Sequence, residues 1–308
     1  MNALRTIVLV AVPYSAMAIF LVGVAWRVLV WAQSPVPFRI PTTCGQQKSL
    51  PWIRSSWLEC PHTTFGAVAR VASEVLLFRS LFRNHAPERN GFRLVYSETR
   101  LLWLGALSFH WSLLAILVRH LRLFLVPVPK AVLALQAVDG FLQFGIPVVY
   151  LSDAVLLAAL LYLAGRRIAN PRLRYLSLAA DHLALLLLIS LAVSGMWMRY
   201  VSRIDVAGIK QYAMGLVTFS PVLPREGGAL FYIHVTLVSL LLAWFPFSKL
   251  MHMGGIFLSP TRNLANNSRM KRHLNPWNPV VAVHSYEEWE DEFRVKMIDA
   301  GLPVEKQP

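Results

Sequence analysis

Long apolar stretches alternate with polar segments along this chain, and five of the stretches are long enough to cross a bilayer. A hydrocarbon core of about 30 Å needs roughly 20 mainly apolar helical residues. The five stretches are Ile7–Leu29, Leu101–Phe124, Phe144–Ala164, Leu178–Met198 and Ala229–Leu250. The first is too long for the apolar part of a signal peptide and lacks a small-residue cleavage site, so we expect a retained anchor. The pattern predicts an all-α integral membrane protein, a bundle of five transmembrane helices.

The polar region between the first two spans, residues 33–100, is too long for a turn. Within it, Phe65–Arg83 has apolar residues at helical spacing, with Arg70, Arg79 and Arg83 around them. This spacing predicts a cytoplasmic amphipathic helix, lying either on the membrane surface or against a partner subunit.

The polar region after the fifth span, residues 259–308, predicts a soluble tail behind a membrane domain of residues 1–258. Its acidic segment Ser285–Met297 is expected to form a short helix, either at a docking surface or simply solvated. We expect this tail to dock a partner.

Composition supports a membrane protein, because 56% of the 308 residues are hydrophobic, only 15% are charged and the mean hydropathy is +0.50. The net charge of +14 would suggest nucleic acid in a soluble protein. Here the basic residues fall between apolar runs, so the positive-inside rule explains them and we expect no nucleic-acid partner. Most of the basic residues lie in the polar region 33–100, the Arg166–Arg174 turn and the tail. This predicts that the N-terminus lies outside and the C-terminus in the cytoplasm.

Four of the nine histidines fall on two predicted spans, His110 and His120 on the second, His234 and His252 on or just after the fifth. Ionisable groups inside a membrane are costly and usually functional, although a histidine can also hydrogen-bond between helices. On straight helices the first two are about 15 Å apart and the last two about 27 Å apart. The two spans run antiparallel in an alternating bundle, so His110 should face His252 and His120 should face His234.

This crossed pairing predicts two haems b between the second and fifth spans, each with two histidine ligands. The ligands would be His110 and His252 on the cytoplasmic side, and His120 and His234 on the outer side. The unequal spacings require tilted haems, with ligands about 6 Å different in height. The alternative is a set of buried, hydrogen-bonding histidines.

Other polar residues are candidates for supporting roles. Arg119 and Lys249 could pair with haem propionates, or could be ordinary cations at helix ends. A quinone site needs an apolar slot and a polar group for the ring oxygens. Candidates for that group near the outer haem are Arg119, Arg122, Lys130, Gln136 and Asp139.

The two cysteines, Cys44 and Cys60, form neither a disulfide framework nor an iron–sulfur or zinc pattern. We interpret them as thiols rather than metal ligands. His182, beside Asp181 at the start of the fourth span, is interpreted as a polar residue at a helix end.

Three segments resemble the gamma subunit of respiratory nitrate reductase: SFHWSLLAILVRH (Ser108–His120), LLLAWFPFSKLMH (Leu240–His252) and GRRIANPRLR (Gly165–Arg174). The resemblance implies that the four histidines ligate two b haems in the crossed arrangement. It also implies electron transfer between a quinone near the outer haem and a cytoplasmic iron–sulfur partner near the inner one.

Three further segments depart from that subunit: IPTTCGQQKSLPWIR (Ile40–Arg54), VLLFRSLFRN (Val75–Asn84) and NPWNPVVAVHSYEEWEDEFRVKM (Asn275–Met297). They resemble the DsrM family, the cytochrome b subunits of a transmembrane complex tied to dissimilatory sulfite reduction. The resemblance implies a cytoplasmic iron–sulfur partner of the heterodisulfide-reductase type. It also implies a periplasmic multihaem cytochrome c, a periplasmic iron–sulfur subunit and a second quinone-interacting membrane subunit.

We therefore expect an electron-transfer subunit of a quinone oxidoreductase complex in sulfur-compound metabolism, with menaquinone or ubiquinone as substrate. Whether this chain itself carries the quinone site is open. The alternatives are a nitrate reductase gamma subunit, the membrane subunit of a heterodisulfide reductase, and a non-redox anchor or transporter. Transport is disfavoured because proton relays use membrane-depth carboxylates, and the spans offer essentially Asp153 and Asp181, both near helix ends.

Overall fold

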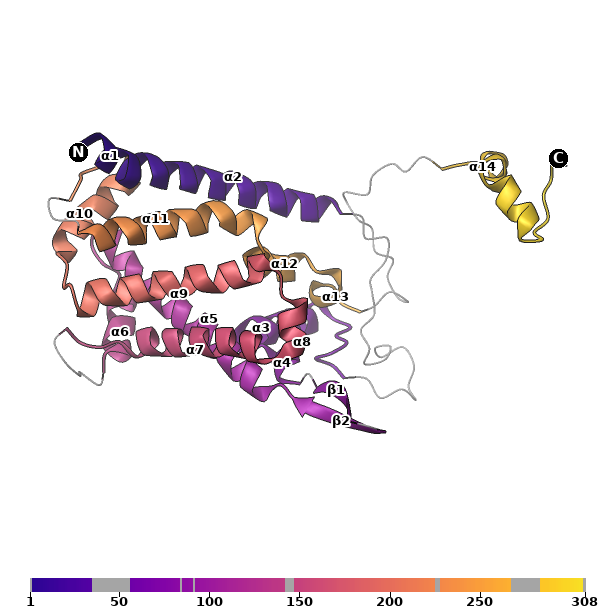
Figure 1. Cartoon of the computed structure of the whole chain (residues 1–308), viewed down its shortest axis with the longest axis horizontal. Coiled ribbons are helices and arrows are strands. Elements are labelled where there is room, and N and C mark those ends of the chain that lie inside the picture. Colours follow the sequence, from indigo (N-terminus) through magenta and orange to yellow (C-terminus); the bar gives the residue numbers. More distant parts are fainter. Residues whose placement is uncertain are drawn as a thin grey trace.

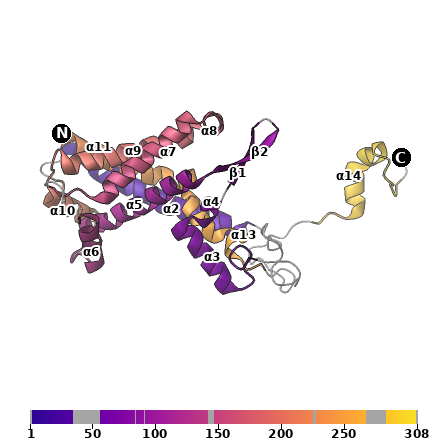
Figure 2. The same ribbon diagram turned by 90° about the horizontal axis from the view of Figure 1, so that it is seen from below.

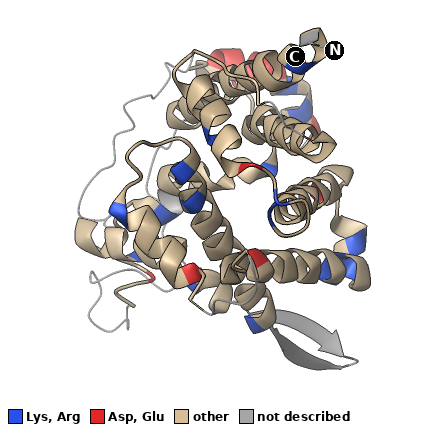
Figure 3. Ribbon diagram, turned by 90° about the vertical axis from the view of Figure 1, so that its left-hand side faces the viewer, with Lys and Arg blue, Asp and Glu red and all other residues tan. Residues whose placement is uncertain are grey.

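Five long helices lie side by side and alternate in direction in the computed structural model (Figure 1). The structure describes residues 2–34, 56–83, 85–90, 92–141, 147–224, 228–266 and 283–306. The long helices are α2 (Val12–Gln33), α5 (Arg100–His120), α7 (Leu151–Ala169), α9 (Ala179–Tyr200) and α11 (Ala229–Trp244). Helices α5, α7, α9 and α11 pack in that order, and α2 packs on α11. Viewed from the end of the bundle, most of the helical ribbon belongs to uncharged residues (Figure 3).

Four helices of the described chain are long and apolar enough to cross a membrane. They cover Ala3–Gln33, Arg100–Leu123, Ala179–Tyr200 and Ala229–Phe247. These match the first, second, fourth and fifth predicted spans, so the expectation of an apolar helical bundle is confirmed.

The third predicted span corresponds to α7, which begins at Leu151 rather than Phe144 and ends at Ala169 rather than Ala164. Asp153, already inside the predicted span, now lies in the first turn of a 19-residue helix whose last turn holds Arg166 and Arg167, so the apolar stretch is shorter than predicted. Helix α7 nevertheless packs tightly on α5. A Cβ on Gly105 of α5 would lie 2.6 Å from the Tyr162 ring of α7, so the two helices approach this closely only with glycine there.

The first long helix is anchored to the segment that follows α9. The chain runs from α1 (Asn2–Thr6) through a π-helical turn (Ile7–Ala11) into α2. A π turn changes which carbonyls are paired, and the Leu9 carbonyl accepts a 2.8 Å bond from the Tyr212 hydroxyl of α10 (Val206–Val217). Leu9, Tyr212, Met198 and Phe231 form a buried cluster at this end of the bundle. Burial raises the pKa of Tyr212.

The fifth predicted span is not one straight helix. Helix α11 ends at Trp244, two 3₁₀ turns (Phe245–Phe247 and Lys249–Met251) follow, and α12 (His252–Gly255) comes next. Pro246 lacks an N–H and its ring clashes with the preceding turn, which ends the helix. Its ring packs so closely on α2 that a Cβ on Gly23 would lie 2.7 Å from it. The prediction of one helix over Ala229–Leu250 was therefore wrong beyond Trp244.

The predicted amphipathic helix is divided into α3 (Thr64–Leu77) and α4 (Arg79–Phe82) at Phe78, which has a left-handed backbone. In addition, α3 buries polar residues against the rest of the chain and exposes apolar ones. Arg70 and Glu74 are buried against α13 (Pro260–Asn263), whereas Phe65, for example, is exposed. Figure 2 shows α3 beside α13 at one side of the bundle. Arg70 therefore lies outside the apolar face, as expected, but on a face that is buried rather than solvated.

The remaining elements are short. They are α6 (Lys130–Asp139), α8 (Pro171–Leu176), a 3₁₀ turn after α5 (Leu121–Leu123) and one after α12 (Ile256–Leu258). Strands β1 (His85–Asn90) and β2 (Arg93–Glu98) form an antiparallel hairpin that the all-helical expectation omitted. Cys44 and Ile40–Arg54 lie outside the described residues, and Cys60 is buried.

The helix expected over Ser285–Met297 is present as α14 (Tyr286–Asp299). Ser285 and Glu288 form a reciprocal cap at its start. The Glu290 carboxylate accepts bonds from the backbone N–H groups of Lys306 and Glu305, which hold the pKa of Glu290 below its ordinary value. The acidic helix thus binds the end of the chain that follows it.

Candidate haem and quinone sites

His110 of α5 and His252, the first residue of α12, come together at the α12 end of the bundle. Their ring centroids are 6.0 Å apart and their planes are 85° apart. An iron held between two imidazoles needs two metal–nitrogen bonds of roughly 2 Å and about 1 Å to each ring centre, which gives about 6 Å. The spacing of this pair therefore fits the two axial ligands of one haem.

His120 and His234 form a second pair toward the opposite end of the bundle. His120 is the last residue of α5, ten residues from His110, so the two lie about 15 Å apart along the helix. His234, near the start of α11, is close enough to His120 for their charges to interact. The structure thus brings His110 beside His252 and places His234 within electrostatic range of His120, although α11 is broken before His252. That these four histidines ligate two haems stays a prediction.

All four histidines use Nδ1 for a hydrogen bond within the protein. A histidine whose Nδ1–H is donated to an acceptor presents Nε2 with a free electron pair, the usual state of a metal-binding imidazole. The acceptors are Ala106 O for His110 (2.8 Å), Ile116 O for His120 (2.7 Å), Lys249 O for His252 (2.9 Å) and Ser194 Oγ for His234 (2.8 Å). The donor set therefore fits two bis-histidine haems.

Ser194 of α9 is a site residue that the sequence reasoning missed. Its hydroxyl is bonded to Leu191 O at 3.1 Å as well as to His234, and its side chain is buried. The next residue, Gly195, leaves room for the imidazole, because a Cβ there would lie 3.3 Å from His234 Cε1. The only signal in the sequence is a Ser-Gly pair inside a leucine-rich span.

Arg119, predicted to contact a quinone or a propionate, is bound by carboxylates of its own chain. Its Nε lies 2.9 Å from Asp139 Oδ2, and its Nη2 donates to Ser152 Oγ at 3.0 Å and pairs with Asp153. The guanidinium also stacks 3.9 Å above the Tyr150 ring. Arg119 and Asp139 therefore join α5, α6 and α7 in a buried ionic cluster.

A cavity of about 370 Å³ lies beside the His120 end of α5. Its polar lining is Arg122, Gln136 and Lys210, and its walls are apolar side chains that include Leu123, Leu133 and Val206. Arg122 Nη1 donates to Gln136 Oε1 at 3.0 Å. Apolar walls with a few converging polar groups are typical of a small-molecule site.

This cavity brings together two of the five predicted quinone residues, Arg122 and Gln136. Lys130 is exposed at the start of α6 and lies outside the lining. Lys210 of α10 was missed, although a lysine that is the one charged residue of the segment Val206–Val217 is a signal that could have found it.

Lys249, the other predicted propionate partner, is largely exposed and pairs with Asp181 at 2.9 Å. Arg167 Nη1 lies 3.5 Å from the same carboxylate. These pairs connect the end of α7 and the start of α9 to the 3₁₀ turn Lys249–Met251, just before His252. His182 is exposed in the first turn of α9, in keeping with a helix-end residue.

The apolar bundle and its histidine pairs define a class, the integral membrane proteins of several spanning helices. Residues 64–272 match the nitrate reductase gamma subunit family, and the chain belongs to that family. It is 45% identical to a protein of Archaeoglobus fulgidus over 277 residues, 88% of this chain and 83% of the relative. It is 44% identical to one of Archaeoglobus profundus over 278 residues, 87% and 82% of the two chains. Both are named Hdr-like menaquinol oxidoreductase cytochrome b-like subunit, and the predicted relationship to the gamma subunit and DsrM-like proteins is confirmed.

Proposed function

We propose that this chain is the dihaem cytochrome b subunit of a membrane-bound menaquinol oxidoreductase. His110 and His252 would ligate one haem, and His120 and His234 the other. The observation that carries the proposal is the pairing of four histidines, each with Nδ1 hydrogen-bonded and Nε2 available, one pair being 6.0 Å apart. The names of the two relatives support the same function.

In the membrane, we place α7 as the fifth spanning helix. Two of its charges favour this, because Asp153 at one end is neutralised by Arg119 and Arg167 at the other end lies near Asp181. The basic segments then face the cytoplasm and the N-terminus lies outside, in a prokaryotic inner membrane. The His110–His252 haem is the cytoplasmic one, and the His120–His234 haem is the outer one.

Menaquinol would be oxidised in the cavity beside His120. The leucine and valine walls take up the apolar ring, and Arg122, Gln136 and Lys210 bind its oxygens. Oxidation of one quinol releases two electrons and two protons, and each haem iron, when bound, accepts one electron at a time. Because the cavity is at the outer end, the protons leave toward the outside. The two histidine pairs, whose members on α5 lie about 15 Å apart along that helix, would hold the irons, and the cytoplasmic pair lies at the end from which the electrons would leave.

The electron acceptor is a cytoplasmic iron–sulfur subunit of the heterodisulfide-reductase type, in a complex of sulfur-compound metabolism. Its further members are the periplasmic cytochrome c and iron–sulfur subunits and the second quinone-interacting membrane subunit. The acidic helix α14 would be covered by other subunits of this complex. The exposed apolar face of α3 would be covered either by the complex or by lipid.

The test is a dithionite-reduced minus oxidised spectrum of the purified full-length chain. We expect two b-type haems per polypeptide, and one in each of the variants His120→Ala and His252→Ala. His182→Ala removes an exposed histidine from α9 and should keep both haems. A His120→Ala variant with two haems would contradict the crossed ligation. A wild-type chain without haem would refute the redox function and favour a non-redox anchor or transporter.

Two redox alternatives share this haem content. The first is a nitrate reductase gamma subunit, which the family match alone also fits. The second is the membrane subunit of a heterodisulfide reductase, which would use another lipid carrier. The names of the relatives favour menaquinol oxidation. The subunits that co-purify with the native chain decide among the three: a molybdenum-containing nitrate reductase would refute our choice.

A further inference from the structure

The turn between α3 and α4 places an aromatic ring against a predicted haem ligand. The Phe78 ring packs edge-on against His110, with centroids 4.9 Å apart and planes at 89°. Phe78 has φ 49° and ψ 45°, the left-handed region that disfavours residues with a Cβ. Such strain persists where the surrounding structure holds it, and it is found most often at functional sites. The side chain therefore calls for an explanation that a simple turn does not supply.

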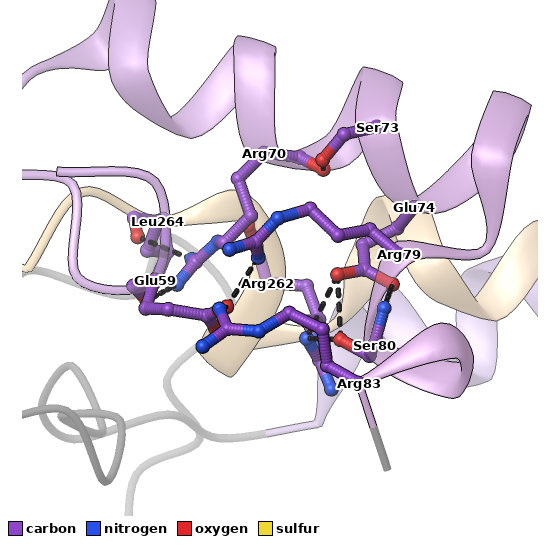
Figure 4. Close-up of polar contacts among 9 residues, drawn as sticks. All are labelled: Glu59, Arg70, Ser73, Glu74, Arg79, Ser80, Arg83, Arg262 and Leu264. Carbon is purple, nitrogen blue, oxygen red and sulfur yellow. Dashed lines mark hydrogen bonds and ion pairs between the residues drawn. The ribbon is translucent and has the colours of Figure 1, made fainter. Parts of the chain in front are cut away.

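A polar bracket of Glu74, Ser80 and Arg262 holds this turn closed (Figure 4). The Glu74 carboxylate accepts bonds from Ser80 N at 3.0 Å and from Ser80 Oγ at 2.5 Å. Arg262 Nη1 donates to Ser80 Oγ at 2.8 Å and lies 3.5 Å from Glu74 Oε1. Because Glu74 precedes Phe78 and Ser80 follows it, the bracket fixes the direction in which the Phe78 ring projects.

The bracket is also attached to the chain that follows His252. The buried Arg70 side chain donates to the backbone carbonyls of Glu59, Arg262 and Leu264 at 2.7–3.3 Å (Figure 4). Burial, the largest cause, lowers the pKa of Arg70 from its ordinary value. Residues 262 and 264 come shortly after α12, which begins at His252.

The other side of the turn is attached to α5, the helix that carries His110. Trp103 Nε1 donates to Leu77 O at 2.7 Å, and Trp111 Nε1 donates to Leu76 O at 3.0 Å. The last carbonyls of a helix have no hydrogen-bond donor within that helix, and these two bonds supply donors to Leu76 and Leu77 at the end of α3. Phe78 is thus fixed relative to both α5 and the segment after His252.

We propose that Phe78 is a positioning residue for the haem between His110 and His252. Its ring fixes the plane of the His110 imidazole and keeps water from that side of it, and the Glu74–Ser80–Arg262 bracket holds the ring in place. This inference rests on the proposed ligation of that haem by His110 and His252. The angle between the two imidazole planes and the access of water both affect a haem's spectrum and potential.

The test compares Phe78→Gly with the wild-type chain. Glycine is favoured in the left-handed region, so this substitution removes the ring while suiting the backbone of the turn. Phe82→Leu is the matched control, because the Phe82 ring packs edge-on against Trp103 at 4.9 Å in the same segment and does not contact His110. Glu74→Gln is the second variant, since it weakens the bracket and leaves the ring in place.

The measurements are the EPR spectrum of the oxidised protein, which reports the angle between the imidazole planes, and a redox titration. His120→Ala identifies the signal of the His110–His252 haem, because it should retain only that one. We expect Phe78→Gly to alter the EPR signal of this haem and to lower its potential, because added water favours the more positively charged ferric state. The expected shift is at least threefold in the equilibrium constant, about 28 mV at 59 mV per tenfold change.

Phe82→Leu should change neither property, and Glu74→Gln should shift the same haem in the same direction by less. Unchanged EPR and potential in Phe78→Gly, or an equal change in Phe82→Leu, would overturn the inference while leaving a two-haem chain and the proposed function intact. If Phe78→Gly binds neither haem, Glu74→Gln decides: a change confined to the His110–His252 haem supports the inference, and no change overturns it. A wild-type chain without haem overturns both proposals.

Discussion

Replacing Ser194 by alanine tests the haem proposal at the His120–His234 pair without touching either ligand. In the structure, His234 Nδ1 is 2.8 Å from Ser194 Oγ, and the hydroxyl is also bonded to Leu191 O. Because the hydroxyl donates to Leu191 O, its oxygen is the acceptor for the Nδ1–H tautomer of His234. An acceptor on Nδ1–H makes the imidazole a better electron donor to a metal and stabilises the ferric state. Ser194→Ala should therefore raise the potential of this haem.

The size of the effect follows from the hydrogen bond. A neutral bond of this kind contributes a net of about 0.5–1.5 kcal/mol. If it strengthens by that amount in the ferric state, its loss raises the one-electron potential by roughly 20–60 mV, at 59 mV and 1.4 kcal/mol per tenfold change. Loss of such a partner also costs about 10–100-fold in metal affinity in other histidine sites, so weaker haem retention is expected.

The assay is a potentiometric titration of both haems in Ser194→Ala and in Ser239→Ala. Ser239 is the control because it is a buried serine on the same helix as His234, and its hydroxyl donates to Val235 O at 2.8 Å. We expect the first variant to raise one potential and the control to change neither. Equal shifts in the two variants, or a shift of the His110–His252 haem instead, would refute the role assigned to Ser194.

Three further predictions concern packing, the cavity and the tail. Gly105→Ala should destabilise the bundle by about 1–3 kcal/mol, seen as a lower Tm in detergent, because its Cβ would lie 2.6 Å from an aromatic ring of α7. A Cβ on Gly165 would have no atom within 4 Å, so Gly165→Ala should leave the stability unchanged or raise it by up to about 1 kcal/mol. Lys210→Ala should raise the KM for a quinol analogue roughly 10–100-fold, while Lys130→Ala, outside the cavity, should not. The pKa of Glu290 is held below its ordinary value of 4.5, so its bonds to Glu305 N and Lys306 N should persist above pH 4.5 and be lost as the pH falls below it. NMR shifts of these two backbone amides that stay constant below pH 4.5 would contradict this.

The positions of the helices could be predicted because the bilayer imposes one strong requirement, a long apolar run. The start of α11 at Ala229 and the start of α5 at Arg100 follow the apolar pattern to within one residue, whereas α5 ends four residues before the predicted Phe124. The shift of α7 could not be predicted from hydropathy alone. Its first charge, Asp153, is stabilised by Arg119, a partner 34 residues earlier in the chain.

The candidate site could be predicted to the extent that it depends on rare residues in apolar surroundings. Histidines in a span stand out, and the cavity residues Arg122 and Gln136 do so for the same reason. Ser194 and Phe78 do not, because serine and phenylalanine are ordinary residues of membrane helices. Their roles depend on a neighbour, His234 or His110, that only the packing brings close.

The break after Trp244 removes a difficulty in the spacing of the histidines. If α11 continued to His252, its two histidines would be about 27 Å apart against about 15 Å on α5, and each haem would have to tilt to meet both ligands. Because Pro246 ends the helix and Ser248 is extended, the eighteen residues from His234 to His252 no longer form one straight axis. His252 then reaches a position 6.0 Å from His110 on a separate short helix. The irregular segment thus replaces the straight helix on which the spacing of about 27 Å was based, so that spacing no longer requires tilted haems by itself.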